Sequence, residues 1–215
     1  MGTTLLPKRQ TSGVEAGERD LPVDDHVLVA QVKAGQTQSY GELVRRYQDR
    51  IFNTCWRICG HLEDARDLTQ EAFLKAFESL DGYRQESGFY TWIFRVATNL
   101  AISHRRSVGR KKTLLDGQAD LVRSQADALV RRIAQSVEDG SDDAGDATAR
   151  VAALLQTLDD EQRAVVVLRD IEGFDYQQIS DILGVPQGTV KSRLHRARMA
   201  LREAITSAQK DSKRT

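Results

Sequence analysis

The segment from Tyr176 to Leu201, YQQISDILGVPQGTVKSRLHRARMAL, constrains the fold more than any other part of the chain. Apolar residues at helical spacing give its first half a stripe that must be buried. Gly184 can adopt the left-handed conformation that ends a helix, and Pro186 suits the first turn of the next helix, where its missing N–H costs nothing. The segment therefore predicts two short helices joined by a tight turn.

The second of these helices carries an apolar stripe on one face and polar and basic side chains on the other. Val190, Leu194, Ala197 and Leu201 follow the i, i+4, i+7, i+11 spacing of a buried face. A small residue at the helix entrance, followed by polar side chains and cations, suits the major groove of DNA. A helical hairpin with a solvated basic face is the alternative, but no acidic residue lies between positions 189 and 202. The expected duplex contacts are Gly188, Lys191, Ser192, His195, Arg196 and Met199.

Charge is separated along the chain although the formal net charge is zero. Basic clusters cover positions 105–112 and 191–202, whereas acidic residues gather at 63–78 and 138–146. This separation indicates partners of both signs. No run approaches the roughly 20 apolar residues that a membrane span needs, and the first residues lack the apolar core of a signal peptide. We therefore expect a cytoplasmic protein without a membrane span.

The cysteine and histidine residues do not form a convincing catalytic or metal site. Cys55 and Cys59 are four positions apart in a helical pattern, which rarely permits a disulfide and fits a reducing compartment. They could bind a metal together with His61, but no fourth ligand is evident, so helix packing is the preferred interpretation. The chain also lacks a G-x-x-x-x-G-K-[ST] phosphate loop. We expect no cofactor, no metal and no enzymatic activity.

Helical periodicity dominates and strand alternation does not persist, which predicts an all-α fold. We expect two small helical domains joined by a flexible linker, the C-terminal one a helix-turn-helix. The first helix should begin near Asp24, capped by Asp24 or Asp25, and the second should end near Gly60. Further helices are expected at about 63–80, 89–106, 122–137, 151–158 and 161–171. The predicted divisions are a disordered extension (1–20), a first domain (21–108), an acidic flexible linker (109–148), a second domain (149–208) and a disordered tail (209–215).

The helix expected at about 63–80 has one apolar and one acidic face. Its buried stripe should consist of Ala65, Leu68, Ala72, Phe73, Ala76 and Leu80. The opposite face carries four carboxylates, an amide and a leucine, which suits a basic protein partner. A solvated helix face explains the same pattern, since single exposed leucines are common. The candidate contacts on this face are Asp67, Gln70, Glu71 and Leu74.

Five aromatic residues fall between positions 83 and 94, beside arginines and an amide. Aromatic rings can stack on unpaired bases, amides can read base edges and cations can hold the phosphate backbone. Packing in the core is the preferred interpretation of Phe89 and Phe94, whereas Tyr83 and Trp92 are interpreted as nucleic-acid contacts. Ile102 is expected to face outward with them. The candidate single-strand contacts are Tyr83, Trp92, Arg95, Thr98, Asn99, Arg105 and Arg106.

Three segments together resemble bacterial sigma factors of the extracytoplasmic-function (ECF) group of the sigma-70 family. They are DARDLTQEAFLKAFESL, YRQESGFYTWIFRVATNLAISHRR and IEGFDYQQISDILGVPQGTVKSRLHRAR, and they occur in the family's order. The resemblance implies a subunit that binds core RNA polymerase, recognises the −35 and −10 promoter elements and promotes strand opening. It also implies an anti-sigma factor as a partner.

The resemblance implies a polymerase or DNA contact for two of the segments. The acidic helix would bind the clamp helices of the largest polymerase subunit, because Asp67, Gln70 and Glu71 match the family's D-x-x-Q-E pattern. The helix-turn-helix would bind the −35 duplex and lie at the flap of the second-largest subunit. The residues that match the family's DNA-contacting positions there are Lys191, Ser192, His195 and Arg196.

The remaining segment would capture the non-template strand of the −10 element. The resemblance places Tyr83 at the pocket for a flipped base and Asn99 as a base-reading residue. Arg105 and Arg106 would hold the adjoining backbone. Ile102 departs from the polar or basic residue that relatives often carry, so the −10 sequence of relatives should not be transferred. The acidic linker would thread the polymerase toward its active centre.

A stand-alone transcription regulator is the alternative function. It would use the helix-turn-helix for an operator and the first domain for sensing or dimerisation. Such a protein would bind duplex DNA specifically without polymerase. A sigma factor alone should bind weakly, because each domain offers only a small basic surface.

Overall fold

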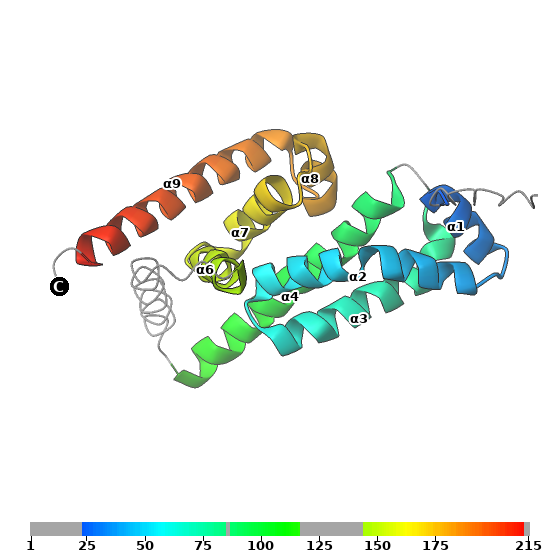
Figure 1. Ribbon diagram of the computed structural model, residues 1–215, viewed down its shortest axis with the longest axis horizontal. Coiled ribbons are helices and arrows are strands. Elements are labelled where there is room, and N and C mark those ends of the chain that lie inside the picture. The colour runs from blue at the N-terminus through cyan, green and yellow to red at the C-terminus, as the bar shows by residue number, and fades with distance from the viewer. Residues whose placement is uncertain (1–22, 85–86, 117–143, 213–215) are drawn as a thin grey trace, which may run out of the picture.

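The computed structural model describes residues 23–84, 87–116 and 144–212, and every regular element within these ranges is helical (Figure 1). The all-α prediction is therefore confirmed. The N-terminal half contains α1 (Asp25–Lys33), α2 (Gln38–Cys59), α3 (Leu62–Glu78), the 3-10 turn η1 (Leu80–Gly82) and α4 (Phe89–Asp116). The C-terminal half contains α6 (Ala144–Gln156), α7 (Asp160–Val166), the π-helical stretch η2 (Val167–Ile171), α8 (Tyr176–Leu183) and α9 (Gln187–Ser212).

The helices extend into the segments that the sequence suggested as linker and tail. α4 continues to Asp116, α6 already begins at Ala144, and α9 reaches Ser212. The helix expected at 122–137 and most of the acidic run lie outside the described residues, as does the N-terminal extension. The apolar periodicity fades in the polar ends of these elements, which explains why the predicted helices were shorter.

Local capping explains where the helices of the turn motif begin and end. Asp175 caps α8 by accepting a hydrogen bond from the Gln178 backbone N–H at 2.8 Å, and the Gln178 side chain accepts from the Asp175 N–H at 2.9 Å. This reciprocal pair is a capping box. Gly184 ends α8 with φ of 64°, as the sequence predicted. Pro186 lies just before α9 rather than in its first turn, and its carbonyl accepts from the Val190 N–H at 3.1 Å.

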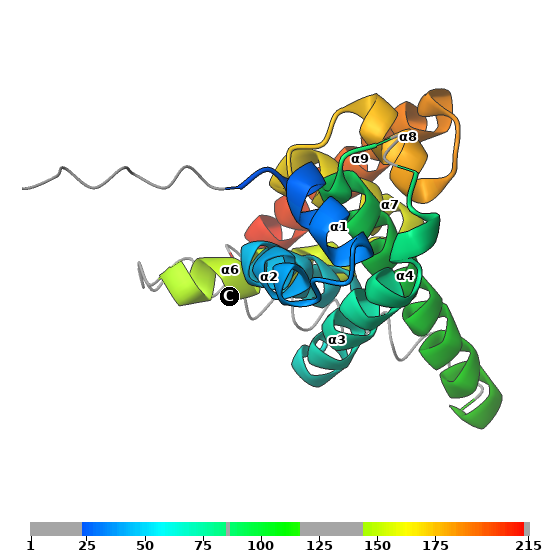
Figure 2. The ribbon, with the colours of Figure 1, turned by 90° about the vertical axis from the view of Figure 1, so that its right-hand side faces the viewer.

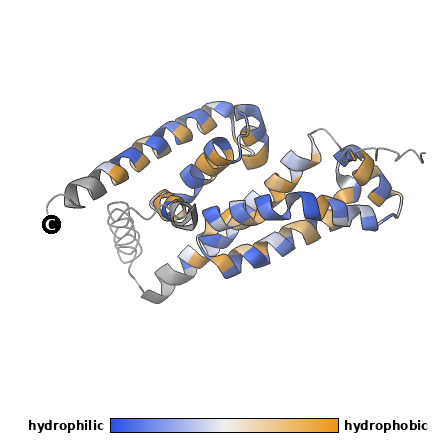
Figure 3. Cartoon of the chain, viewed as in Figure 1, coloured by the Kyte–Doolittle hydropathy of each residue, from blue (hydrophilic) through white to orange (hydrophobic). Residues whose placement is uncertain are grey.

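The buried stripes of α3 and α9 follow the predicted spacing. Five of the six apolar residues expected on this stripe lie in α3, the sixth, Leu80, lies in η1, and all six are buried. In α9, Val190, Leu194 and Ala197 are buried and Leu201 is partly buried. The hydrophobic bands of α9 face α7, and its hydrophilic bands lie on the opposite side (Figure 3). The outer face of α9 is thus left for polar contacts.

The two halves pack directly on one another. α8 lies on α4, and α6 lies on α2 (Figure 2). We call this contact surface, formed by α2 and α4 with α6, α7, η2 and α8, the seam. Phe174 is only 2% exposed, and its ring stacks on Tyr90 and meets Phe94 edge-on, with centroid distances of 4.8 and 5.0 Å. The seam therefore has an apolar centre of its own.

Charged side chains surround that apolar centre. The Glu172 carboxylate is 5% exposed and accepts hydrogen bonds from Arg50 Nη2 at 3.1 Å and Thr54 Oγ1 at 3.0 Å. Arg57 Nη1 lies 3.7 Å from the same carboxylate. Because a buried carboxylate needs such partners, these contacts fix the loop after η2 against α2.

Candidate nucleic-acid and protein interfaces

The exposed face of the α8–α9 motif carries all six residues that the sequence suggested for duplex contact. They are Gly188, Lys191, Ser192, His195, Arg196 and Met199, and each is exposed. α9 presents them together because its opposite side packs into the core. The arrangement offers a small residue at the helix entrance, hydrogen-bonding side chains next and cations beside them, which fits a DNA groove.

Not every cation of α9 belongs to this exposed face. Arg193 forms an ion pair with Glu161, and Arg198 pairs with Asp170 at 2.5 Å. Arg193, which is 18% exposed, links α9 to α7, whereas the Arg198–Asp170 pair lies on the surface. Lys191 and Arg196 remain on the outer face, where they can meet phosphates or bases.

A second candidate surface lies on α4. Trp92, Arg95 and Asn99 follow i, i+3 and i+7 spacing and share one side of the helix. Arg95 and Asn99 are exposed, and Trp92 is partly exposed. An aromatic ring, a guanidinium and an amide in one stripe are the groups that hold unpaired bases.

Tyr83, which the sequence assigned to nucleic acid rather than to the core, packs in the core, and its contact with a flipped base stays a prediction. Tyr83 is only 6% exposed and stacks on Trp92 with a centroid distance of 4.8 Å. Its hydroxyl donates to the Ser87 carbonyl at 2.5 Å, and burial raises its pKa above the usual value. Tyr83 thus supports the loop and the Trp92 ring from beneath.

The expectation that Thr98 and Ile102 face outward is wrong, because both are buried. α4 packs on α2 and α3 and also on α8, so its buried arc is wider than in a helix covered on one side. The periodicity of α4 alone does not predict that α8 also covers it. The structure leaves Arg95 and Asn99, but not Thr98, available to a DNA strand.

We expect the substitution Thr98→Val to leave promoter selection unchanged and to keep or raise stability by up to about 1 kcal/mol. The Thr98 hydroxyl is buried and has no hydrogen-bond partner within the part of the chain that the structure describes. Replacing such a group by a methyl group of similar size removes an unpaired polar atom. Urea denaturation measures stability, and transcription from a set of −10 variants measures promoter selection. A loss of promoter selectivity at unchanged stability would contradict the buried placement.

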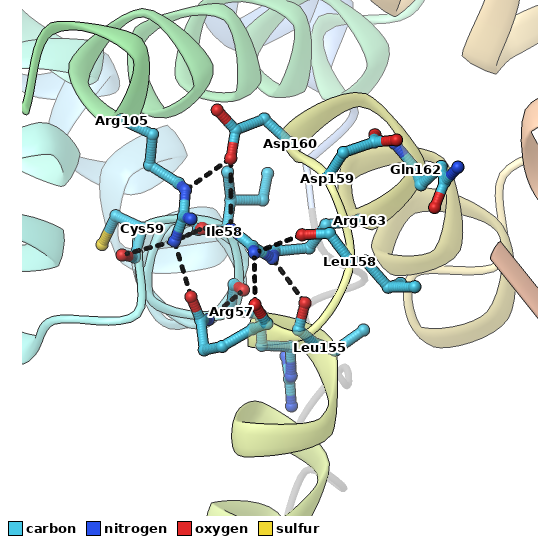
Figure 4. A network of polar contacts seen from close by, with 11 residues as sticks. Arg57, Ile58, Cys59, Arg105, Leu155, Leu158, Asp159, Asp160, Gln162 and Arg163 are labelled. Atoms are coloured by element: carbon cyan, nitrogen blue, oxygen red, sulfur yellow. Dashed lines mark hydrogen bonds and ion pairs between the residues drawn. The ribbon is translucent and has the colours of Figure 1, made fainter. Parts of the chain in front are cut away.

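Arg105 and Arg106 both contact the C-terminal half. Figure 4 shows the contacts of Arg105. Arg105 Nε donates to Asp160 Oδ1 at 2.6 Å, and its Nη1 donates to Gln156 Oε1, also at 2.6 Å. Arg106 Nη2 lies 2.8 Å from Glu161 Oε1. The acidic first turn of α7 attracts both guanidinium groups. Both guanidinium groups are occupied in this arrangement, and their contact with the DNA backbone stays a prediction.

Sequence reasoning missed Arg163, the largest fully buried side chain of the described residues. Its guanidinium donates to the carbonyls of Leu155, Ile58, Leu158 and Gln156 at 2.6, 2.9, 2.7 and 3.2 Å (Figure 4). Burial and the nearby Arg105 lower the pKa of Arg163 to about 9. This value is still above neutral pH, so the guanidinium remains charged there. The only sequence signal is its place directly before the apolar run AVVVL.

The outer face of α3 is acidic, as predicted, and also partly apolar. Asp67, Gln70 and Glu71 are exposed, and Leu74 is 58% exposed. Phe77, which the sequence did not single out, adds a second exposed apolar side chain. Carboxylates around an apolar pair fit a basic protein surface better than they fit DNA.

The two cysteines behave as packing residues. Cys55 is buried, which raises the pKa of its thiol to about 12. The Cys59 thiol lies 3.3 Å from the His61 carbonyl. Within residues 23–84, 87–116 and 144–212, no three His, Cys, Asp or Glu side chains are grouped to hold a metal ion. The helices in the same ranges are also too short or too polar to span a membrane.

Comparison with known proteins places the candidate surfaces on α3, α4 and α9 in matched regions. The family model "Sigma-70 region 2" matches residues 43–111, and "Sigma-70, region 4" matches residues 148–201. The chain is 34% identical over 182 residues to the RNA polymerase sigma-H factor of Pseudomonas aeruginosa, covering 84% of this chain and 93% of that one. It is 33% identical over 182 residues to the ECF RNA polymerase sigma factor SigW of Bacillus subtilis, covering 82% and 94%.

A solved structure shares the fold. The sigma factor RpoE in complex with the anti-sigma factor NepR from Bartonella quintana aligns with a TM-score of 0.58 and 23% identity. The alignment covers 79% of this chain and 98% of that chain. The helical arrangement is thus common to both proteins.

Proposed function

Because the chain belongs to the sigma-70 family, as an RNA polymerase sigma factor of the ECF group that recognises promoters, we propose that its surfaces divide this task. The α3 face binds core polymerase. The α4 stripe captures the melted −10 strand, and the α8–α9 motif binds the −35 duplex. The observation that supports this division most is the exposed α9 face, on which all six suggested groove contacts lie together.

Contacts on α9 should separate base reading from phosphate binding. We expect Arg196→Ala to weaken −35 recognition by about 1–3 kcal/mol if the guanidinium meets a base edge. The loss should then appear mainly on promoters with the preferred base at one position. A similar loss on all sequences would assign Arg196 to phosphate instead. Holoenzyme binding to a set of −35 variants measures the difference, with Arg202→Ala as an exposed cation control on the same helix.

Strand opening on this proposal is driven by the capture of unpaired bases. Stacking on a ring such as Trp92 contributes about 1–3 kcal/mol per base. Extrusion of a base from the duplex costs a few kcal/mol. The two quantities are close, so the −10 sequence decides whether the DNA opens. Arg95 and Asn99 lie on the same side of α4 to hold the backbone and read a base edge.

The two halves must separate before both promoter elements can be bound. The names of the −35 and −10 elements give their positions on the promoter, which differ by about 25 base pairs. At 3.4 Å per base pair this is roughly 85 Å of duplex. In the described arrangement α8 lies directly on α4. Polymerase would hold the halves apart, which frees Arg105 and Arg106 from α7 and raises the effective concentration of each half at its element.

The proposal extends to the partners and setting of the protein. It is a dissociable, non-enzymatic subunit that acts in the cytoplasm, where it meets polymerase and promoter DNA. The structural relative from Bartonella quintana is in complex with an anti-sigma factor. We propose a partner of that class for this chain, and the exposed acidic and apolar face of α3 offers it a surface.

In-vitro transcription with core polymerase on a random-promoter library tests the proposed function. The purified chain should start RNA synthesis from a defined subset of templates, and the subset reads out its specificity. A gel shift without polymerase provides the companion test. Tight sequence-specific binding of the free chain to duplex DNA, with no transcription in the presence of core enzyme, would favour a stand-alone regulator and overturn the proposal.

A further inference from the structure

Lys33, at the end of α1, binds backbone carbonyls at the start of the loop that precedes α4. Its Nζ donates to the Tyr83 carbonyl at 2.8 Å and to the Asp81 carbonyl at 3.2 Å. Carbonyls that follow a helical turn such as η1 lack helical partners, and an ammonium group has three donors to offer them. The same ammonium lies 5.9 Å from the centroid of the Tyr83 ring. Lys33 therefore fixes both the backbone and the ring at this position.

Tyr83 passes this restraint on to the loop exit and to Trp92. Its hydroxyl donates to the Ser87 carbonyl, so one side chain fastens the far end of the same loop. Its ring is stacked on Trp92 at an interplanar angle of 29° and meets Phe89 edge-on. The loop is thus held at its entrance by Lys33 and at its exit by Tyr83.

Trp92 is the first residue of the stripe that it shares with Arg95 and Asn99. We propose that Lys33 is a positioning residue for base selection at the −10 element. Through Tyr83, it fixes the loop and the Trp92 ring relative to the exposed groups of α4. This inference rests on the proposed capture of the −10 strand by that stripe. Within the residues that the structure describes, Lys33 forms no hydrogen bond or ion pair with the stripe, so it acts through its neighbours.

The chemistry makes the position of the ring decisive. A base stacks well only when the ring lies parallel to it at van der Waals distance, and neighbouring groups must then reach the base edge. If the loop shifts, both conditions fail for the captured base, while the surfaces on α3 and α9 remain as they are. Loss of the Lys33 ammonium should therefore affect selection at one element and not at the other.

The test uses holoenzyme assembled from core polymerase and the full-length chain, with Lys33→Met, Lys33→Arg and the wild type. Transcription is measured from a library randomised across both promoter elements. We expect Lys33→Met to reduce the preference at one −10 position roughly tenfold, within the range that loss of base stacking allows. The −35 preference and the affinity for core should not change, and Lys33→Arg should restore most of the preference. Arg45→Met removes an exposed cation of the same half and is the matched control.

Hydrogen exchange on the free chain supplies a second measurement. The amides of Arg84 and Ser87 should exchange faster in Lys33→Met than in the wild type or in Arg45→Met. An unchanged −10 profile, unchanged exchange, or an equal loss at both promoter elements would each overturn the positioning role while leaving the proposed function in place. A wild-type holoenzyme that opens no promoter in the library would overturn the proposed function and this inference with it.

Discussion

Replacing Arg163 with methionine is expected to lower the free energy of unfolding by about 3–5 kcal/mol. The Arg163 guanidinium is fully buried and is the shared donor for four backbone carbonyls from the end of α2 and the α6–α7 connection. Its removal takes a donor from all four buried acceptors. Leu155 O keeps the Leu158 N–H at 3.2 Å and Ile58 O keeps Arg105 Nη1 at 3.4 Å, whereas the Gln156 and Leu158 carbonyls lose their side-chain donor. Each buried polar group left unpaired costs about 1–3 kcal/mol. Asp160 would also lose one of its two cationic neighbours. The large cost follows from breaking a buried network by removing its central member.

Urea denaturation followed by circular dichroism measures this effect. Arg198→Met is the matched control, because Arg198 pairs with Asp170 on the surface and exposed pairs contribute only about 0–1 kcal/mol. The control should therefore remain near wild-type stability. If Arg163→Met lost no more than the control, the guanidinium would not hold the seam together. A drop in the midpoint with an unchanged slope would indicate a loss of stability rather than a change in the unfolded state.

The sequence predicted those features that depend on one helix and its own periodicity. The apolar stripes of α3 and α9 are where the spacing placed them, because each of these helices has a single buried side. Gly184 ends α8 for a reason that is local to the chain. The exposed acidic face of α3 and the exposed outer face of α9 follow from the same stripes.

Features that depend on contact between the two halves could not be predicted from single helices. Thr98 is buried on a helix that packs on α2 and α3 of its own half and also on α7 and α8 of the other half. A helical wheel drawn for one domain does not include the second pair. The sequence predicts Arg105 as a DNA-binding residue. In the structure its guanidinium instead contacts Asp160, which is 55 positions later in the chain. Arg163 shows no periodic signal, since its partners are backbone carbonyls, which every residue carries. Distant contacts of this kind decide which of the candidate residues are free to bind DNA.

Reversing the charges of Asp67 and Glu71 to arginine is expected to abolish binding to core polymerase. Both carboxylates are exposed on α3 beside Leu74, so the change alters the surface and not the core. A surface that had attracted a basic partner would then repel it. Close charge pairs across interfaces contribute about 1.5–7 kcal/mol. We therefore expect the dissociation constant to rise more than about 100-fold, which corresponds to roughly 3 kcal/mol.

Co-purification and a titration of labelled chain with core polymerase measure this loss. The double reversal of Asp49 and Glu203 changes net charge by the same amount at two exposed positions outside α3. It should bind core polymerase nearly as the wild type does, which separates a local contact from a general effect of charge. Circular dichroism and the unfolding midpoint should be unchanged in both double variants, because none of the four side chains is buried. Undiminished co-purification of the Asp67 and Glu71 double variant would remove α3 from the polymerase interface and leave its acidic face as solvated surface.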